Sequence, residues 1–65
     1  MFYVIDTNYN ELVPYYDAKS VSVYLLGRRI SNYIVIKWDE ESKESKLYTP
    51  STGDVFTIEQ ELESL

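Results

Sequence analysis

Four carboxylates in the middle of the chain are the side chains best placed to do chemistry. Asp39, Glu40 and Glu41 are consecutive, and Glu44 follows after Ser42 and Lys43. Paired carboxylates can act as general acid and base, and clustered carboxylates bind hard cations such as Ca²⁺. A Ca²⁺-binding loop also needs oxygen ligands at alternate positions around a central glycine, and this stretch has none. The spacing therefore predicts neither a metal site nor a bound cofactor.

Histidine and cysteine are both absent from the 65 residues. These are the side chains most easily poised near neutral pH as a base or a nucleophile. The two glycines, Gly27 and Gly53, lie far apart, and neither belongs to a phosphate-binding loop. We therefore predict that the protein is not an enzyme and has no catalytic residues. Disulfides are excluded as well, so nothing indicates an oxidising compartment.

The net negative charge of the chain comes from its second part. Residues 1–38 carry a net charge of +1 and residues 39–65 a net charge of -6, which together give the overall -5. An overall negative field disfavours nonspecific binding to phosphates, so nucleic acid is not the expected partner. A DNA-binding role would have to rely on a local basic patch.

No apolar run approaches the about 18 residues that are needed to cross a bilayer, and the N-terminus lacks the basic and apolar regions of a secretory signal. We expect a cytoplasmic protein with no membrane partner. Few alanines and glycines beside many Tyr, Ile, Asn, Lys and Glu make the composition resemble that of small bacteriophage proteins from AT-rich genomes.

The length predicts one domain, residues 1–65, near the lower limit at which a single core can support folding. The chain also carries more tyrosines than a core of this size is expected to bury. Those at issue are Tyr9, Tyr15, Tyr16 and Tyr33. We therefore predict self-association or obligate partner binding, for example a homodimer formed through a sheet edge.

The first sixteen residues have the pattern of a β-hairpin with a four-residue connection, "TNYN". Asn8 and Asn10 suit positive φ in that connection. Pro14 cannot donate a backbone hydrogen bond, so the second strand should lie at an edge. Both faces of the first strand, "FYVID", are apolar, which indicates a strand covered on both sides.

Residues 18–26 fit two periods. As a helix, the segment would be capped by Asp17 and ended by Gly27; as a strand, Val21, Val23 and Leu25 would alternate with polar residues. The cap and the stop favour the helix. The strand would instead belong to an all-β small barrel, which stays open as the alternative.

The remaining elements complete an α+β fold. "SNYIVIKWD" is expected to be a central strand, with Trp38 buried, followed by the acidic connection and the antiparallel strand "SKLYT". "DVFT" would add a third strand to this meander, and a short helix with Thr57 as its N-cap would end the chain. The predicted core is Phe2, Val4, Val21, Leu25, Ile34, Ile36, Leu47, Phe56 and Ile58.

The acidic part of the chain predicts a non-enzymatic binding protein. Such a protein would act as a nucleic-acid mimic and cover a basic, nucleic-acid-binding surface of a host protein. We expect it to be an inhibitor of phage or mobile-element origin with an anti-defence role. The connection "DEESKES" has an equally strong structural interpretation as a solvated hairpin turn. The predicted partner-binding residues are Asp39, Glu40, Glu41, Glu44, Tyr48, Glu59, Glu61 and Glu63.

An alternative function comes from the stretch "AKSVSVYLLGRRISNYIVIKW", which resembles a phage-type helix-turn-helix. The resemblance implies a DNA-binding regulator whose second helix begins at "RRISNY" and enters the major groove. Arg28, Arg29, Ser31 and Asn32 would then meet phosphates and base edges. Three consecutive β-branched residues in "YIVI" favour a strand instead.

Overall fold

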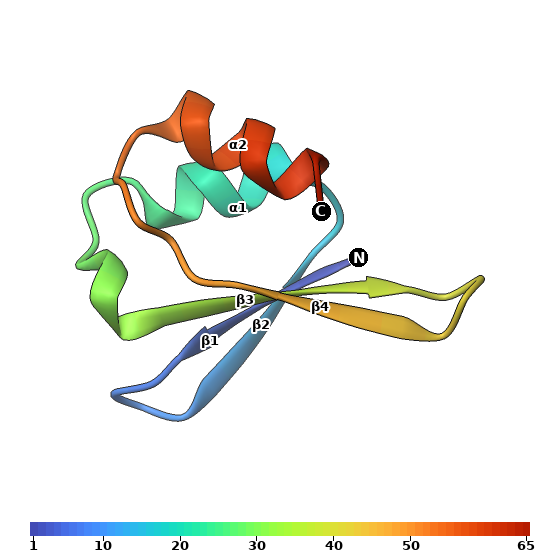
Figure 1. Cartoon of the computed structure of the whole chain (residues 1–65). Coiled ribbons are helices and arrows are strands. Elements are labelled where there is room, and N and C mark those ends of the chain that lie inside the picture. The colour runs from blue at the N-terminus through green and yellow to red at the C-terminus, as the bar shows by residue number, and fades with distance from the viewer.

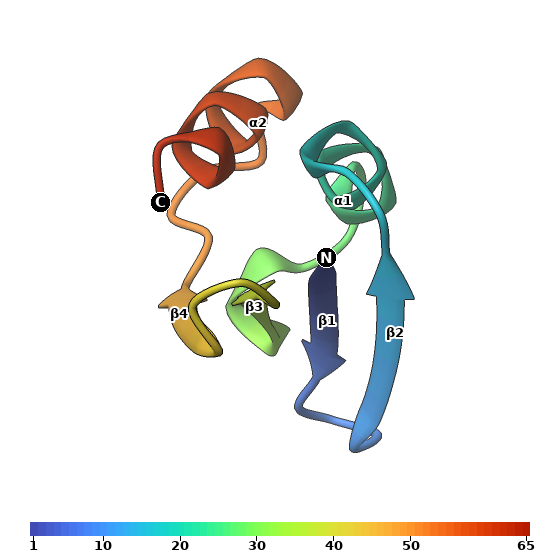
Figure 2. The same cartoon turned by 90° about the vertical axis from the view of Figure 1, so that its right-hand side faces the viewer.

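The computed structural model describes all residues, 1–65, and shows a four-stranded antiparallel sheet with two helices packed on one face (Figure 1, Figure 2). The strand order is β2-β1-β3-β4. The α+β prediction is therefore confirmed. In chain order the elements are β1 (Phe2–Asp6), β2 (Glu11–Tyr15), α1 (Ala18–Leu25), the 3₁₀ helix η1 (Ile30–Asn32), β3 (Tyr33–Asp39), β4 (Glu44–Tyr48) and α2 (Val55–Glu63).

The N-terminal hairpin forms as its turn residues predict. Asn10 has φ 53°, a left-handed conformation that Asn adopts readily. The carboxylate of Asp6 accepts a hydrogen bond from the backbone N–H of Asn8 at 2.9 Å. β2 lies at one edge of the sheet, where Pro14 leaves no donor missing from an internal ladder.

Residues 18–25 are helical, so the strand alternative and its all-β barrel are not formed. Asp17 caps α1 by accepting a hydrogen bond from Ser20 N at 2.8 Å. Gly27, with φ 76°, follows the last turn and turns the chain toward the sheet. The end signals thus identified the correct period where the apolar spacing could not.

The predicted last strand of the meander is wrong, because "DVFT" begins α2. Asp54, not Thr57, is the N-cap, and its carboxylate accepts hydrogen bonds from both the backbone N–H and the hydroxyl of Thr57. Asp and Thr are both common capping residues, and the Asp lies three positions earlier.

Neither α1 nor α2 combines the length and apolarity that a membrane-crossing helix requires.

The core lies between the sheet and the two helices. The helices contribute Val21, Leu25, Ile58 and Leu62, all fully buried, against Val35 and its neighbours on the sheet. Every buried side-chain polar atom has a hydrogen-bond partner. Phe2, Val4, Val21, Leu25 and Ile58 confirm the predicted core in part.

Four predicted core residues lie outside it. Ile34 and Ile36 belong to the side of β3 that faces away from the helices, together with Leu47 of β4, which is 71% exposed. Both sides of β3 are apolar, so alternation could not show which side the helices cover. Phe56 is 76% exposed, because the buried stripe of α2 runs through Ile58 and Leu62.

Three tyrosines form a cluster between α1 and the sheet. The ring centroids of Tyr15 and Tyr24 are 5.4 Å apart, and those of Tyr24 and Tyr33 are 5.9 Å apart. Arg28 lies 4.1 Å from the centroid of Tyr24. Tyr33 is buried and Tyr15 half-buried, whereas Tyr9 and Tyr16 are exposed as expected.

Candidate protein-binding surfaces

Two of the four hairpin carboxylates lie beside lysines. Asp39 is opposite Glu44 in the register of β3 and β4, and Lys37 is opposite Lys46 two positions along. Residues two apart on a strand share a face, so the four side chains form one cluster of alternating charge. With Ser42 and Leu65 they line a hollow of about 100 Å³.

The turn of this hairpin carries the other two carboxylates, Glu40 and Glu41, both exposed. The carboxylate of Asp39 accepts a hydrogen bond from Glu41 N at 3.0 Å, and this bond holds the pKa of Asp39 below its usual range. Lys43 has φ 58° and closes the turn. The hairpin projects beyond the helix layer (Figure 1), so Glu40 and Glu41 meet solvent at its tip.

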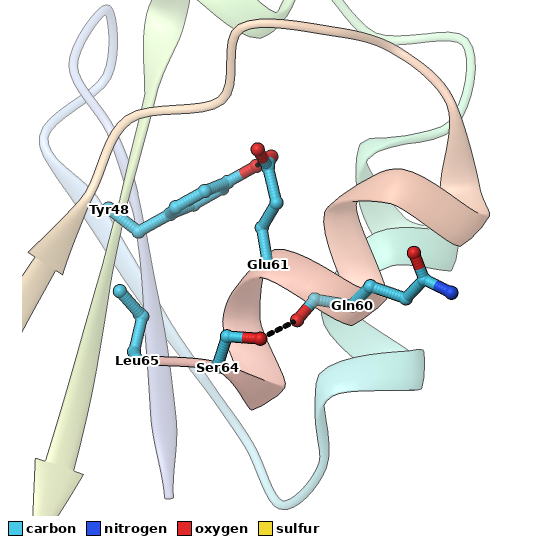
Figure 3. A pocket seen from close by; sticks show the side chains of 5 residues that line it. All are labelled: Tyr48, Gln60, Glu61, Ser64 and Leu65. Atoms are coloured by element: carbon cyan, nitrogen blue, oxygen red, sulfur yellow. Dashed lines mark hydrogen bonds between the residues drawn. The ribbon is translucent and has the colours of Figure 1, made fainter.

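Tyr48 joins β4 to α2. Its hydroxyl donates a hydrogen bond to Glu61 Oε1 at 2.6 Å, across a hollow of about 520 Å³ that Gln60, Ser64 and Leu65 also line (Figure 3). Burial of the ring, followed by the bond to Glu61, raises the pKa of Tyr48. Its side chain is half-buried and its hydroxyl engaged, so Tyr48 is not presented as the free anchor that the sequence predicted.

The three carboxylates of α2 lie on two sides of the helix. Glu61 faces β4, whereas Glu59 and Glu63, two residues before and after it, are rotated by about 200°. Phe56 precedes Glu59 by three residues and Glu63 by seven, so these side chains are neighbours on the outside of α2. In Figure 3 the side chain of Gln60 points away from Tyr48. We call this surface the α2 outer face; it consists of Phe56, Glu59, Gln60 and Glu63.

The helix-turn-helix is not formed. The segment after Gly27 contains η1 and β3, and β3 is paired on both sides within the sheet, so no second helix is available to enter a major groove. The guanidinium of Arg28 stacks on Tyr24 and its Nε donates to the Tyr24 carbonyl at 2.8 Å. The carbonyl of Asn32 accepts hydrogen bonds from Thr7, which tie η1 to the N-terminal hairpin.

The side of the sheet opposite the helices has no element packed on it (Figure 2). The prediction that the first strand is covered on both sides is therefore wrong for the single chain, because α1 and α2 both pack on the other side. The ladder places side chains from all four strands on the uncovered side. The sequence carries a signal for this surface, because β1 and β3 have apolar residues at both the odd and the even positions along the strand. That pattern predicts burial on both sides. We call the apolar part of this surface the open face; it consists of Tyr3, Ile5, Leu12, Pro14, Ile34, Ile36, Trp38 and Leu47, and the polar Ser45 of β4 lies beside it, opposite Trp38.

The open face explains the position of Trp38, which is half-buried rather than part of the core. The acidic side chains of the chain do not gather into a group of three that could ligate one metal ion.

Comparison with models of protein families, with curated proteins and with solved structures finds no match to this chain.

Proposed function

We propose that this chain is a non-enzymatic binding domain that places the α2 outer face on a basic surface of another protein in the cytoplasm and blocks access to that surface. The observation that carries the proposal is Phe56, a large aromatic side chain that is 76% exposed. Buried aromatic anchors supply much of the affinity at protein interfaces. In the free domain Phe56 lies outside the core, to which α2 contributes Ile58 and Leu62.

The charges around Phe56 indicate the kind of partner. Glu59 and Glu63 lie within two turns of it, and α2 contains no basic residue. A negative rim around an apolar anchor complements a positively charged surface and speeds encounter with it. Proteins that bind phosphates present such surfaces, so blockage would act by competition with nucleic acid. An inhibitor of phage or mobile-element origin would use this mechanism.

The tip of the β3–β4 hairpin adds a second acidic position. Glu40 and Glu41 are exposed beyond the helix layer, whereas Asp39 and Glu44 share their cluster with Lys37 and Lys46. We assign long-range attraction to the tip and direct contact to the α2 outer face.

The test is affinity capture from a bacterial lysate, followed by measured binding of the purified partner to matched variants. Phe56→Ala should weaken affinity at least tenfold, because it removes the anchor. Leu26→Ala is the control, since Leu26 is also exposed, at 60%, but lies outside α2. The captured partner should release bound nucleic acid when the wild-type chain is added.

Two charge reversals separate the acidic surfaces. Glu59→Lys with Glu63→Lys has the same net charge as Glu40→Lys with Glu41→Lys, so any difference between them reports location. The first pair should abolish binding, and the second should only slow association and flatten its salt dependence.

Unchanged binding by Phe56→Ala and by the α2 reversal, together with loss of binding in Arg28→Ala with Arg29→Ala, would show the proposal to be wrong. Direct binding of the wild type to duplex DNA, with an affinity that falls steeply as salt rises, would show that nucleic acid rather than a basic protein is the partner.

A further inference from the structure

The open face has the composition of a buried surface. Its central residues pair across the sheet, Tyr3 with Ile36 and Ile5 with Ile34, and the outer strands add Leu12 and further apolar side chains. Antiparallel sheets that face water on one side normally carry polar residues there. Leu12 and Leu47 are 56% and 71% exposed. Water therefore covers an apolar layer that spans all four strands.

We propose that a second copy of this chain packs on the open face, sheet against sheet, about a two-fold axis that runs across the strands. The two sheets would lie about 10 Å apart, with both helix layers outside, as in a β-sandwich. The sequence predicted self-association through a sheet edge; the structure offers this face as a larger apolar surface.

Charge favours a second copy and selects the axis. None of the eight side chains of the open face is ionised, so pairing two copies desolvates no charge there. The acidic hairpin tip, with Glu40 and Glu41, lies at the end of β3, and Arg29 precedes its start. An axis across the strands turns one copy end for end. It therefore keeps the two acidic tips apart, whereas an axis along the strands would place them at the same end; each tip then faces the end of the other copy at which Arg29 lies near Asp6 and Glu11.

The area is sufficient for a weak dimer. Four strands about 4.8 Å apart and five residues long, at about 3.3 Å each, span roughly 19 by 17 Å. Because side chains make the surface uneven, the accessible area is larger than this flat outline, about 500 Å² per copy. That is close to a tenth of the 4472 Å² surface and at the lower limit of specific interfaces. Interfaces of this size belong with weak, transient complexes, so we expect dissociation in the micromolar range or above.

This inference does not rest on the proposed function, because it uses the opposite side of the molecule. The α2 outer face points away from the sheet, so each copy in the dimer keeps it accessible. A dimer that binds no basic partner would support this inference and contradict the proposed function. A monomer that binds a basic partner would do the reverse.

Sedimentation equilibrium over about 1 µM to 1 mM tests the proposal, since that range brackets the expected constant. The wild-type mass should rise from 7.7 kDa toward twice that value. The emission of Trp38, the only tryptophan, should shift to shorter wavelength over the same range as the open face is covered. A mass that stays at 7.7 kDa throughout would overturn the proposal.

Charged substitutions locate the contact. Leu47→Lys should be monomeric throughout with an unchanged far-UV spectrum, and Val23→Lys should dimerise like the wild type. Val23 is a matched control, because it is 51% exposed but lies on α1. Equal loss of dimer in both variants would contradict the assignment to the open face.

The axis can be tested by mixing. Leu47 is paired with Ile36 at the middle of β3, so an axis across the strands brings it close to its own counterpart. Leu47→Lys and Leu47→Glu should each be monomeric and should dimerise when mixed. A mixture that stays monomeric would overturn this arrangement. A wild-type chain that is monomeric but binds neutral phosphatidylcholine vesicles would assign the face to a lipid surface instead.

Discussion

The hydroxyl of Tyr48 is engaged by Glu61, and this contact joins the last strand to the last helix. Tyr48→Phe keeps the ring and removes the bond, which should lower the free energy of unfolding by about 0.5 to 1 kcal/mol, since the pair is partly exposed. Urea unfolding measures the change. Glu61→Gln is the control, because an amide oxygen can still accept from the hydroxyl, and it should cost less than Tyr48→Phe.

The raised pKa of Tyr48 also predicts a spectroscopic result. Because the neutral phenol is favoured in the folded state, its contribution to stability is present below the ordinary pKa of 10.0 and is lost as pH rises above that value. Of the seven tyrosines, Tyr48 should therefore ionise last in an absorbance titration. Tyr48→Phe should remove this last component; if the component persists, another tyrosine is responsible.

Asp54 gives a prediction at the acidic end of the pH scale. The hydroxyl and then the backbone N–H of Thr57 lower the pKa of its carboxylate. A lowered folded-state pKa contributes stability that is present above the ordinary value of 3.8 and is lost as pH falls below it. Asp54→Asn retains a capping oxygen but does not titrate, so its stability should fall less steeply than the wild type's between about pH 5 and pH 2. Equal slopes would show that the cap carries no pH dependence.

At the scale of elements, α2 sets which apolar residues are in the core. Leu62→Ala should lower the free energy of unfolding by about 2–5 kcal/mol, because Leu62 is fully buried. Phe56→Ala should change it by less than about 0.5 kcal/mol, because that side chain is mostly in water. Urea unfolding of both variants tests the orientation of α2. The opposite order would show that the helix is rotated about its axis.

At the scale of the whole molecule, both chain ends lie beside the same part of β3. Lys37 Nζ donates to the carbonyl of Leu65 at 3.1 Å, and Trp38 N donates to the carbonyl of Met1 at 2.9 Å. A flexible linker of about ten residues, with a mean span of roughly 17 Å, should therefore join the ends without strain.

A circular permutant closed by that linker and opened between Glu41 and Ser42 should fold cooperatively with the wild-type far-UV spectrum. The opened turn is exposed, so little packing is lost. Opening between Asn8 and Tyr9 provides a matched permutant that keeps the acidic tip intact. If only the first permutant associates more slowly with the partner, the acidic tip is responsible for electrostatic steering. A failure of both permutants to fold would contradict the close placement of the chain ends.

Local signals in the sequence determined most of the secondary structure. The N-terminal hairpin follows from its asparagine-rich turn, α1 from Asp17 and Gly27, and β3 from its run of β-branched residues. These features act over a few residues through capping, positive φ and side-chain packing, so they are independent of distant contacts.

Only the tertiary structure decided which apolar side faces the helices and which carboxylates lie together. β1 and β3 are apolar on both sides, and the choice between them depends on where α1 and α2 pack, a long-range contact that periodicity does not encode. The same packing exposes Phe56, turns Glu61 toward Tyr48 and leaves the open face in water. Charge counting along the chain treated the hairpin and α2 carboxylates as one site. In the sheet, Lys37 shares a side with Asp39 and Lys46 with Glu44, and pairing across β3 and β4 joins these four side chains into one cluster, which separates Asp39 and Glu44 from the other acids.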